Sequence, residues 1–217
     1  MIELENHSSV VIITDTNRKL FLFSGYDEEY PVVQFRGLAH LLGGHSDIKD
    51  ISPYHTLCRE LIEEISVDIN QREKFAPEQD LSLLVNEILS ISKPYADFLV
   101  YSPLDHPLKP NGLRNSLMSC YVSEISEKSF EMARTHLSNG KRMVSEGVMH
   151  YATRDQIVSG KKKLAWSSPA ILRKFLDVQI PNPLESQAIN IGKVRNSMEE
   201  YSEFLYTLPA GRANYKL

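Results

Sequence analysis

The stretch "RELIEEIS", residues 59–66, places three glutamates within five positions of one predicted helix. At about 100° per residue, Glu60, Glu63 and Glu64 fall on one arc of that helix. The opposite arc carries the apolar side chains, namely Leu57, Cys58, Leu61, Ile62 and Ile65. Carboxylates three and four positions apart are neighbours and repel each other. Such a face is either a solvated acidic surface, which is the common case, or a place where a cation offsets the repulsion.

The residues before this helix favour the second reading. Ser52 and Pro53 are typical of a helix start, with serine as N-cap and proline at the first helical position. Gly43 and Gly44 are expected to end regular structure and to lie in a short loop before the helix. Glycine lets a backbone carbonyl approach a ligand closely. A carbonyl with several carboxylates is an all-oxygen ligand set, which suits Mg²⁺ or Mn²⁺ rather than zinc. Because Mg²⁺ in such sites often takes substrate phosphates, the pattern indicates phosphate-ester or diphosphate chemistry.

The longer segment "GGHSDIKDISPYHTLCRELIEEISV", residues 43–67, resembles the signature box of the Nudix hydrolases. That box reads Gly, five residues, Glu, seven residues, then Arg-Glu-apolar-any-Glu-Glu-any-Gly-apolar. The matching positions are Gly43, Gly44, Arg59, Glu60, Leu61, Glu63, Glu64 and Val67. With the surrounding elements, the resemblance covers about residues 8 to 178.

The resemblance implies hydrolysis of a nucleoside diphosphate linked to another group, with Mg²⁺ or Mn²⁺ as cofactor. Glu60, Glu63 and Glu64 would hold the divalent ions, and Gly43 would offer its carbonyl. Arg59 would orient a carboxylate, which we expect to be that of a box glutamate. The metal ions would neutralise the diphosphate and activate water.

Three further residues complete the predicted site. Members of the family often use another glutamate from a later loop, and Glu146 is the candidate, with a plain surface position as the other reading. Arg36 and Gly44 are predicted substrate contacts, although an exposed strand position is the simpler reading of Arg36.

The box departs from the family pattern in its loop. Fourteen residues separate Gly44 from Arg59, where the pattern has thirteen. The first Glu position falls on Asp50 when counted from Gly44 and on Ile51 when counted from Arg59. Asp50 is the candidate substitute, with the extra residue absorbed in the loop. Ser66 replaces the final glycine, so the helix is expected to end differently or to continue.

Length and composition indicate the class of protein and its compartment. A chain of 217 residues, with 42% hydrophobic and 24% charged residues, is typical of one soluble globular domain with an extension. A net charge of −4 does not indicate a large nucleic-acid surface. The expected partner is the small nucleotide diphosphate that the Nudix resemblance implies. Two cysteines, no signal-peptide pattern and no long apolar run predict a cytoplasmic protein without membrane association.

The order of the other elements predicts a mixed sheet flanked by helices. The resemblance implies a Nudix-type α/β/α sandwich over residues 1–180. We expect strands at 10–13, 20–23, 30–37, 116–125 and 148–153, helices at 80–92 and 168–176, and mostly loop at 93–115. The helix at 80–92, inserted after the box, is expected beside the substrate entrance. Residues 181–217 are expected to form a linker and a helical extension, whose apolar stripe packs on the domain or on a second subunit in a homodimer.

Three functions fit these observations. The first is a metal-dependent diphosphohydrolase. The second is a catalytically weak or inactive Nudix-fold module that senses a nucleotide, for which the altered box loop is the motivation. The third is a structural domain with an acidic surface.

Overall fold

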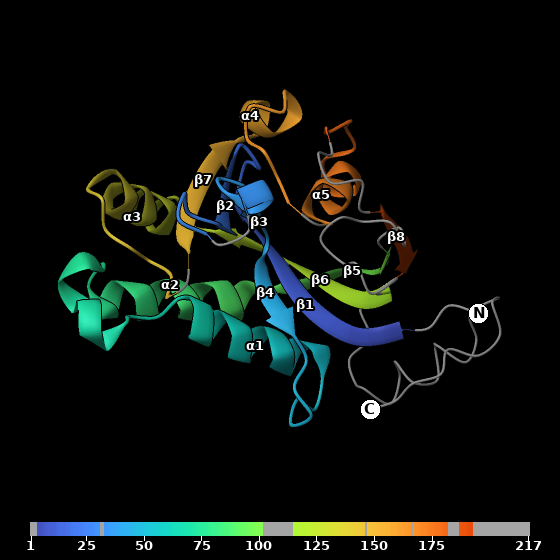
Figure 1. Cartoon of the computed structure of the whole chain (residues 1–217), viewed down its shortest axis with the longest axis horizontal. Coiled ribbons are helices and arrows are strands. Elements are labelled where there is room, and N and C mark those ends of the chain that lie inside the picture. Colours follow the sequence, from blue (N-terminus) through green and yellow to red (C-terminus); the bar gives the residue numbers. More distant parts are fainter. Residues whose placement is uncertain are drawn as a thin grey trace.

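The computed structural model of the chain describes residues 4–30, 33–101, 115–145, 147–165, 167–181 and 187–192. Its centre is a mixed sheet of eight strands in the order β3-β2-β1-β6-β5-β8, with β4 paired to β1 and β7 to β2 (Figure 1). The strands are β1 (Leu4–Asp15), β2 (Leu20–Gly25), β3 (Ala39–His40), β4 (Leu42–His45), β5 (Lys93–Tyr101), β6 (Asn115–Ile125), β7 (Val148–Thr153) and β8 (Gln187–Gly192). β1 and β6 run parallel and the other pairs are antiparallel.

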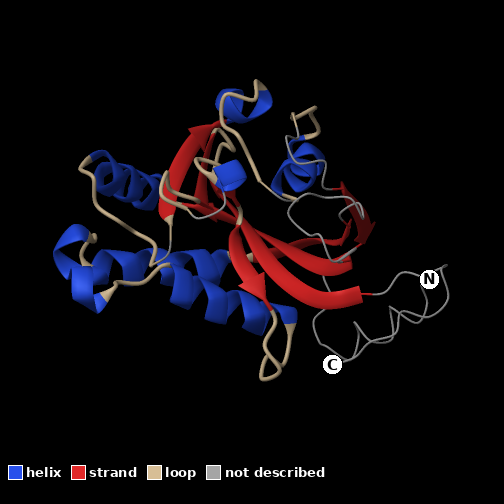
Figure 2. Cartoon of the chain, viewed as in Figure 1, coloured by secondary structure: helices blue, strands red, loops and turns tan. Residues whose placement is uncertain are grey.

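Helices cover both faces of this sheet (Figure 2). They are α1 (Pro53–Glu64), α2 (Glu78–Ile91), α3 (Glu127–Ser138), α4 (Arg154–Val158) and α5 (Ser168–Leu176), with 3-10 turns η1 (Val33–Phe35) and η2 (Ile69–Lys74). One apolar core joins the sheet to α1, α2 and α3, and a second joins it to α4 and α5. The predicted α/β/α sandwich is therefore confirmed.

β1 shows why the sheet lies between two layers. Val11 and Ile13 belong to the core under α1, whereas Val10 and Ile12 belong to the core under α5. Alternate side chains of a strand point to opposite faces, so a strand that is apolar at every position is buried on both. The run "VVII", residues 10–13, therefore already specifies a central strand.

Three local predictions are wrong. The stretch expected as a strand at 30–37 contains the 3-10 turn η1. There Phe35 is 3% exposed and Val33 is 68% exposed, whereas a strand would place both on one face. The Gly43-Gly44 pair lies inside β4, where Ser9 and Val10 of β1 pair with it, and not in a loop.

The third wrong prediction is the loop at 93–115, because residues 93–101 form β5. Pro94 lies where the register between β5 and β6 shifts, between Pro94 and Ala96. Proline is tolerated at such an irregularity because no ladder hydrogen bond is needed from it. Residues 102–114 lie outside the described part of the chain.

The helix expected at 80–92 is confirmed as α2, but not beside the pocket. Its buried stripe, Leu81, Leu84, Val85 and Ile88, belongs to the same core as the inner face of α1. Tyr54 of α1 donates a hydrogen bond to the carbonyl of Leu89, at 2.7 Å. α2 therefore braces α1 from the core side, and no residue of it lines the pocket described below.

The segment after residue 180 is corrected in part. Residues 187–192 form β8, which pairs with β5 at the edge of the sheet, so this part belongs to the sandwich. The helix expected further along, with its apolar stripe, lies outside the described residues. The expected extension therefore stays a prediction for residues 193–217 only.

None of the helices in the described ranges is long and apolar enough to span a bilayer.

Candidate functional site

α1 begins where the sequence predicts. Ser52 is the N-cap, its hydroxyl accepts the backbone N–H of His55 at 3.1 Å, and Pro53 takes the first helical position. The inner arc of the helix is anchored by Leu57, Leu61 and Ile65, which are buried. Ile62 was predicted on the same arc but is 57% exposed. The glutamates on the other arc are thus held at the edge of the sheet by the burial of their neighbours.

Arg59 anchors the loop before the helix through Asp50. Its Nη2 donates to Oδ2 of Asp50 at 2.9 Å and its Nε donates to Oδ1 at 3.2 Å, so the two side chains form a bidentate ion pair. The same Nη2 donates to the carbonyl of His45 at 2.6 Å. Asp50 is only 7% exposed. Of the two residues left open at the first Glu position, Asp50 is therefore the one that contacts the box arginine.

The pKa of Asp50 reflects this burial and pairing. Burial alone raises the pKa of the carboxyl, but hydrogen bonds from Arg59 and from the N–H of Asp47 outweigh it and lower the pKa to about 2. A carboxyl with a lowered folded pKa stabilises the protein above its unfolded pKa and loses that contribution as the pH falls toward the folded value.

The first prediction follows from that sign. Between about pH 4 and pH 2, the wild type should lose about 2 kcal/mol of unfolding free energy through Asp50. The Asp50→Asn variant lacks this titration. Urea unfolding of both proteins across that range should show their difference in unfolding free energy shrinking as the pH falls. A difference that stays constant would contradict the assignment.

Arg59 also contacts two of the three box glutamates. Its Nη1 donates to Glu60 at 2.8 Å and to Glu63 at 3.1 Å. Burial raises the pKa of Glu60 most strongly; Arg59 opposes this, and the charges of Glu63 and Asp50 add to it. The repulsion expected from the sequence is therefore present and is offset in part by Arg59. Arg59 thus contacts two box glutamates, and its role in orienting a carboxylate stays a prediction.

The two glycines of β4 lie against two of the box glutamates, Glu64 and Glu60. The N–H of Gly43 donates to Oε2 of Glu64 at 2.9 Å. Gly43 has φ of +124°, and a Cβ there would lie 2.1 Å from the carbonyl oxygen of Ser9. A Cβ on Gly44 would lie 2.3 Å from a carboxylate oxygen of Glu60. The backbone of β1 therefore requires glycine at position 43, whereas a side chain at position 44 would displace the carboxylate of Glu60 from β4.

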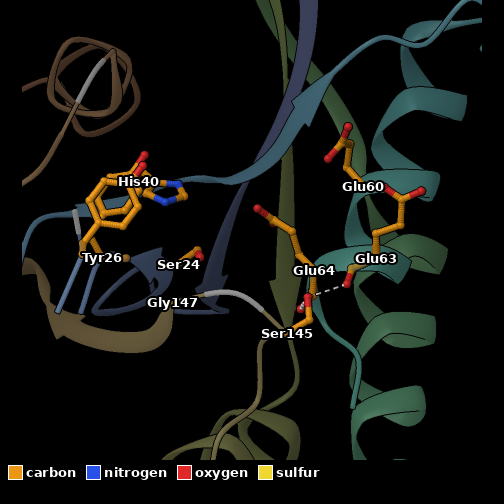
Figure 3. Close-up of a pocket in the computed structure, with 10 residues that line it drawn as sticks. Ser24, Tyr26, His40, Glu60, Glu63, Glu64, Ser145 and Gly147 are labelled. Atoms are coloured by element: carbon orange, nitrogen blue, oxygen red, sulfur yellow. Dashed lines mark hydrogen bonds between the residues drawn. The ribbon is translucent and has the colours of Figure 1, made fainter. Parts of the chain in front are cut away.

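These glutamates line a pocket of about 420 Å³ (Figure 3). Its lining residues are Ser24, Gly25, Tyr26, Tyr30, His40, Glu60, Glu63, Glu64, Ser145 and Gly147. Figure 3 shows the three glutamates on one side and Tyr26 with His40 on the other, with Ser24 and Gly147 between them. The pocket therefore has an acidic wall, formed by Glu60, Glu63 and Glu64, and an aromatic wall, formed by Tyr26, Tyr30 and His40.

The aromatic wall is a packed group of rings. The ring centroid of Tyr26 lies 4.2 Å from that of Tyr30 and 5.0 Å from that of His40. Behind them, buried Phe35 lies 5.3 Å from Tyr26. Burial lowers the pKa of His40, so its imidazole is neutral near pH 7. The sequence carries no signal that separates these rings from ordinary core aromatics, so they are not among the predicted site residues.

The other predicted site residues lie as follows. Arg36 does not line the pocket, and its Nε donates to the carbonyl of Tyr30 at 2.8 Å, so direct substrate contact is not supported. Gly44 makes room for Glu60 and is not a lining residue. Glu146 lies outside the described residues, while its neighbours Ser145 and Gly147 line the pocket. The role of the Gly43 carbonyl stays a prediction.

The acidic wall fits a divalent cation by chemistry, because its side chains offer only hard oxygen donors. Within the described part of the chain, however, no three His, Cys, Asp or Glu side chains are already grouped to hold a metal ion. Glu60 and Glu63 are held by Arg59 instead. For these two residues to become ligands, their hydrogen bonds to Arg59 must be exchanged for the metal.

Comparison with known proteins gives distant structural likeness alone. No family model and no curated protein matches the sequence. Among the solved structures that match is NrtR of Shewanella oneidensis, 16% identical with a TM-score of 0.44, over 79% of this chain and 64% of that one. The Nudix domain of the same protein, complexed with ADP ribose, is 15% identical with a TM-score of 0.45, over 82% of this chain and 88% of that one.

A third match is the Francisella tularensis bifunctional NMN adenylyltransferase/ADP ribose pyrophosphatase, in complex with AMP and a manganese ion. It is 12% identical with a TM-score of 0.46, over 81% of this chain and 42% of that one. This chain thus spans less than two thirds of the matched NrtR chain and of the bifunctional enzyme.

Proposed function

We propose that this protein is a Nudix-type hydrolase, a metal-dependent diphosphohydrolase that cleaves the diphosphate linkage of a nucleoside diphosphate derivative. The observation that carries the proposal is the pocket with Glu60, Glu63 and Glu64 on one wall and Tyr26, Tyr30 and His40 on the other. A molecule with metal-bound phosphates at one end and a flat ring at the other matches both walls. Inorganic diphosphate would leave the aromatic wall without a partner.

The three glutamates would hold Mg²⁺ or Mn²⁺, which supplies charge neutralisation of the diphosphate and activation of water when bound. Arg59, fixed by Asp50, holds Glu60 and Glu63 in position before binding. Gly43 holds the carboxylate of Glu64 against β4. The protein thus presents its three carboxylates from one helix and holds one of them against a strand of the sheet.

The deciding experiment is a turnover screen. Nucleotide sugars, ADP ribose, dinucleotides and modified nucleoside triphosphates are incubated with the protein and Mg²⁺ or Mn²⁺, and the products are separated by chromatography. Metal-dependent release of a nucleoside monophosphate, lost in Glu64→Gln but kept in Glu131→Gln on α3, supports the proposal. An absence of turnover across the panel with both metals contradicts it.

A second candidate function is a nucleotide sensor with little or no turnover. The contacts of Arg59 with Glu60 and Glu63 favour it, because both carboxylates are already paired. A ligand that binds the folded state raises the melting temperature whether or not it is cleaved. Thermal stabilisation by a nucleotide without any product would therefore identify the sensor.

The aromatic wall gives a second testable prediction. Replacing Tyr26 by alanine should raise KM about tenfold with little change in kcat, because stacking on a ring contributes about 1–3 kcal/mol to binding a base. Tyr26→Phe retains the ring and should behave as the wild type. Steady-state kinetics on the best substrate, with melting curves to check folding, decide the matter. An equal effect of both substitutions on KM would show that the ring is not what binds.

A further inference from the structure

The chain between α3 and β7 forms a strap, defined here as residues 141–145 with Gly147. Near its start the strap is hydrogen-bonded to the end of η2 and to the residues that follow it. The N–H of Arg142 donates to the carbonyl of Lys74 at 2.8 Å, and the N–H of Ala76 donates to the carbonyl of Arg142 at 2.9 Å. The guanidinium of Arg142 lies over the ring of Phe75, 5.3 Å from its centroid. This end of the strap is therefore anchored to buried Phe75.

The far end of the strap is tied to the last turn of α1 by Ser145. The N–H of Ser145 donates to the carbonyl of Glu64 at 2.7 Å. Its hydroxyl lies 2.8 Å from the carbonyl oxygen of Glu63 and 3.3 Å from that of Glu64. The last carbonyls of a helix have no partner within the helix. Ser145 therefore caps α1 from a position far away in the sequence.

This cap lies at two of the three glutamates of the acidic wall. Glu63 and Glu64 are the last two residues of α1, and helix ends fray unless their carbonyls are satisfied. Ser145 itself lines the pocket, as does Gly147, whose carbonyl accepts from Nη2 of Arg142 at 3.0 Å. The strap thus joins the end of the acidic wall to the part of the pocket formed by Ser24 and Gly25.

We propose that Ser145 is a positioning residue that holds Glu63 and Glu64 in place for the divalent cation, an inference that rests on the proposed function. The chain offers a matched control, because the hydroxyl of Ser66 also donates to the carbonyl of Glu63 at 2.8 Å. Ser66 is local to the helix end, whereas Ser145 comes from the strap. Comparing Ser145→Ala with Ser66→Ala therefore separates the tie to the strap from the loss of a hydroxyl on the same carbonyl.

The full-length wild type, Ser145→Ala, Ser145→Thr and Ser66→Ala are compared by three measurements. Amide hydrogen exchange of the metal-free proteins reports fraying of the last turn of α1. Titration with Mn²⁺, followed by the paramagnetic resonance of the free ion, reports affinity. Steady-state kinetics separate kcat from KM.

Ser145→Ala should speed exchange at the end of α1, weaken Mn²⁺ binding about fivefold to tenfold and lower kcat with KM little changed. Ser145→Thr should restore all three, and Ser66→Ala should change Mn²⁺ affinity less than about twofold. Equal effects of Ser145→Ala and Ser66→Ala on affinity would overturn the inference, as would unchanged exchange in Ser145→Ala. If the wild type binds no Mn²⁺, the proposed function fails instead, and hydrogen exchange alone then decides whether Ser145 fixes the helix end.

Discussion

Replacing Glu63 and Glu64 together by glutamine is expected to lower the hydrolysis rate by about 10²–10³-fold or more, because the charge that holds the divalent cation is lost. Glutamine keeps the size and helix propensity of glutamate. Its side-chain oxygen can still accept the N–H of Gly43, so the strand contact of residue 64 survives. The measurement is kcat/KM on the best substrate, together with melting curves with and without Mg²⁺.

The stability of the metal-free double variant should stay close to that of the wild type. Glu63 is 60% exposed at its side chain, and exposed ion pairs such as that with Arg59 contribute less than about 1 kcal/mol. Loss of that pair and relief of repulsion therefore offset each other. Stabilisation by added Mg²⁺ should fall, because it depends on binding to the folded state.

The control is the pair Glu127→Gln and Glu131→Gln on α3, which removes the same charge away from the pocket. It should leave both turnover and the Mg²⁺ response unchanged. Equal Mg²⁺-induced melting shifts in the wild type and in the Glu63/Glu64 variant would reject the metal site at these residues.

Replacing Arg59 by alanine is expected to destabilise the fold by about 3–5 kcal/mol, because it leaves the buried carboxylate of Asp50 without its cation. The Asp50 side chain is 1% exposed, so water cannot take over the role of the guanidinium. The loss corresponds to a change of more than about 100-fold in the unfolding equilibrium, measured by urea denaturation at pH 7.

Two variants make this result specific. Arg134→Ala removes an exposed arginine that pairs with Glu131, and it should cost less than about 1 kcal/mol. Adding Asp50→Asn to Arg59→Ala removes the unpaired charge and should recover part of the loss. If Arg59→Ala costs no more than Arg134→Ala, then Asp50 and Arg59 do not form the buried pair described above.

Much of the candidate site follows from sequence because it lies on one helix. Ser52 and Pro53 specify where α1 begins, and the positions of Leu57 and Leu61 specify which face is buried. Helical periodicity then places Glu60, Glu63 and Glu64 together on the outer side without any knowledge of the rest of the chain. The same holds for β1 and β2, where short apolar runs specify central strands.

Predictions failed where a tertiary contact outweighed a local preference. Glycines indicate a break, yet Gly43 and Gly44 pair with β1, whose backbone groups need partners in the buried sheet. Pro94 indicates a loop, yet β5 tolerates it where the register shifts. α3 was not predicted. The capping contact of Ser145 was not predicted either, because its two ends are 81 to 82 positions apart in the chain.

The sequence by itself therefore determined the acidic helix, its start, its buried face and the kind of cation that its oxygen atoms suit, because these depend on spacing within a few turns. Only the tertiary structure decided which residues face those carboxylates. Tyr26, Tyr30 and His40 reach the pocket because β2 and β3 pair and present their ends to it, across from α1. Asp50 reaches Arg59 because the loop folds back on the helix. Contacts of this kind depend on how separate elements pack together, and a pattern within one element does not contain that information.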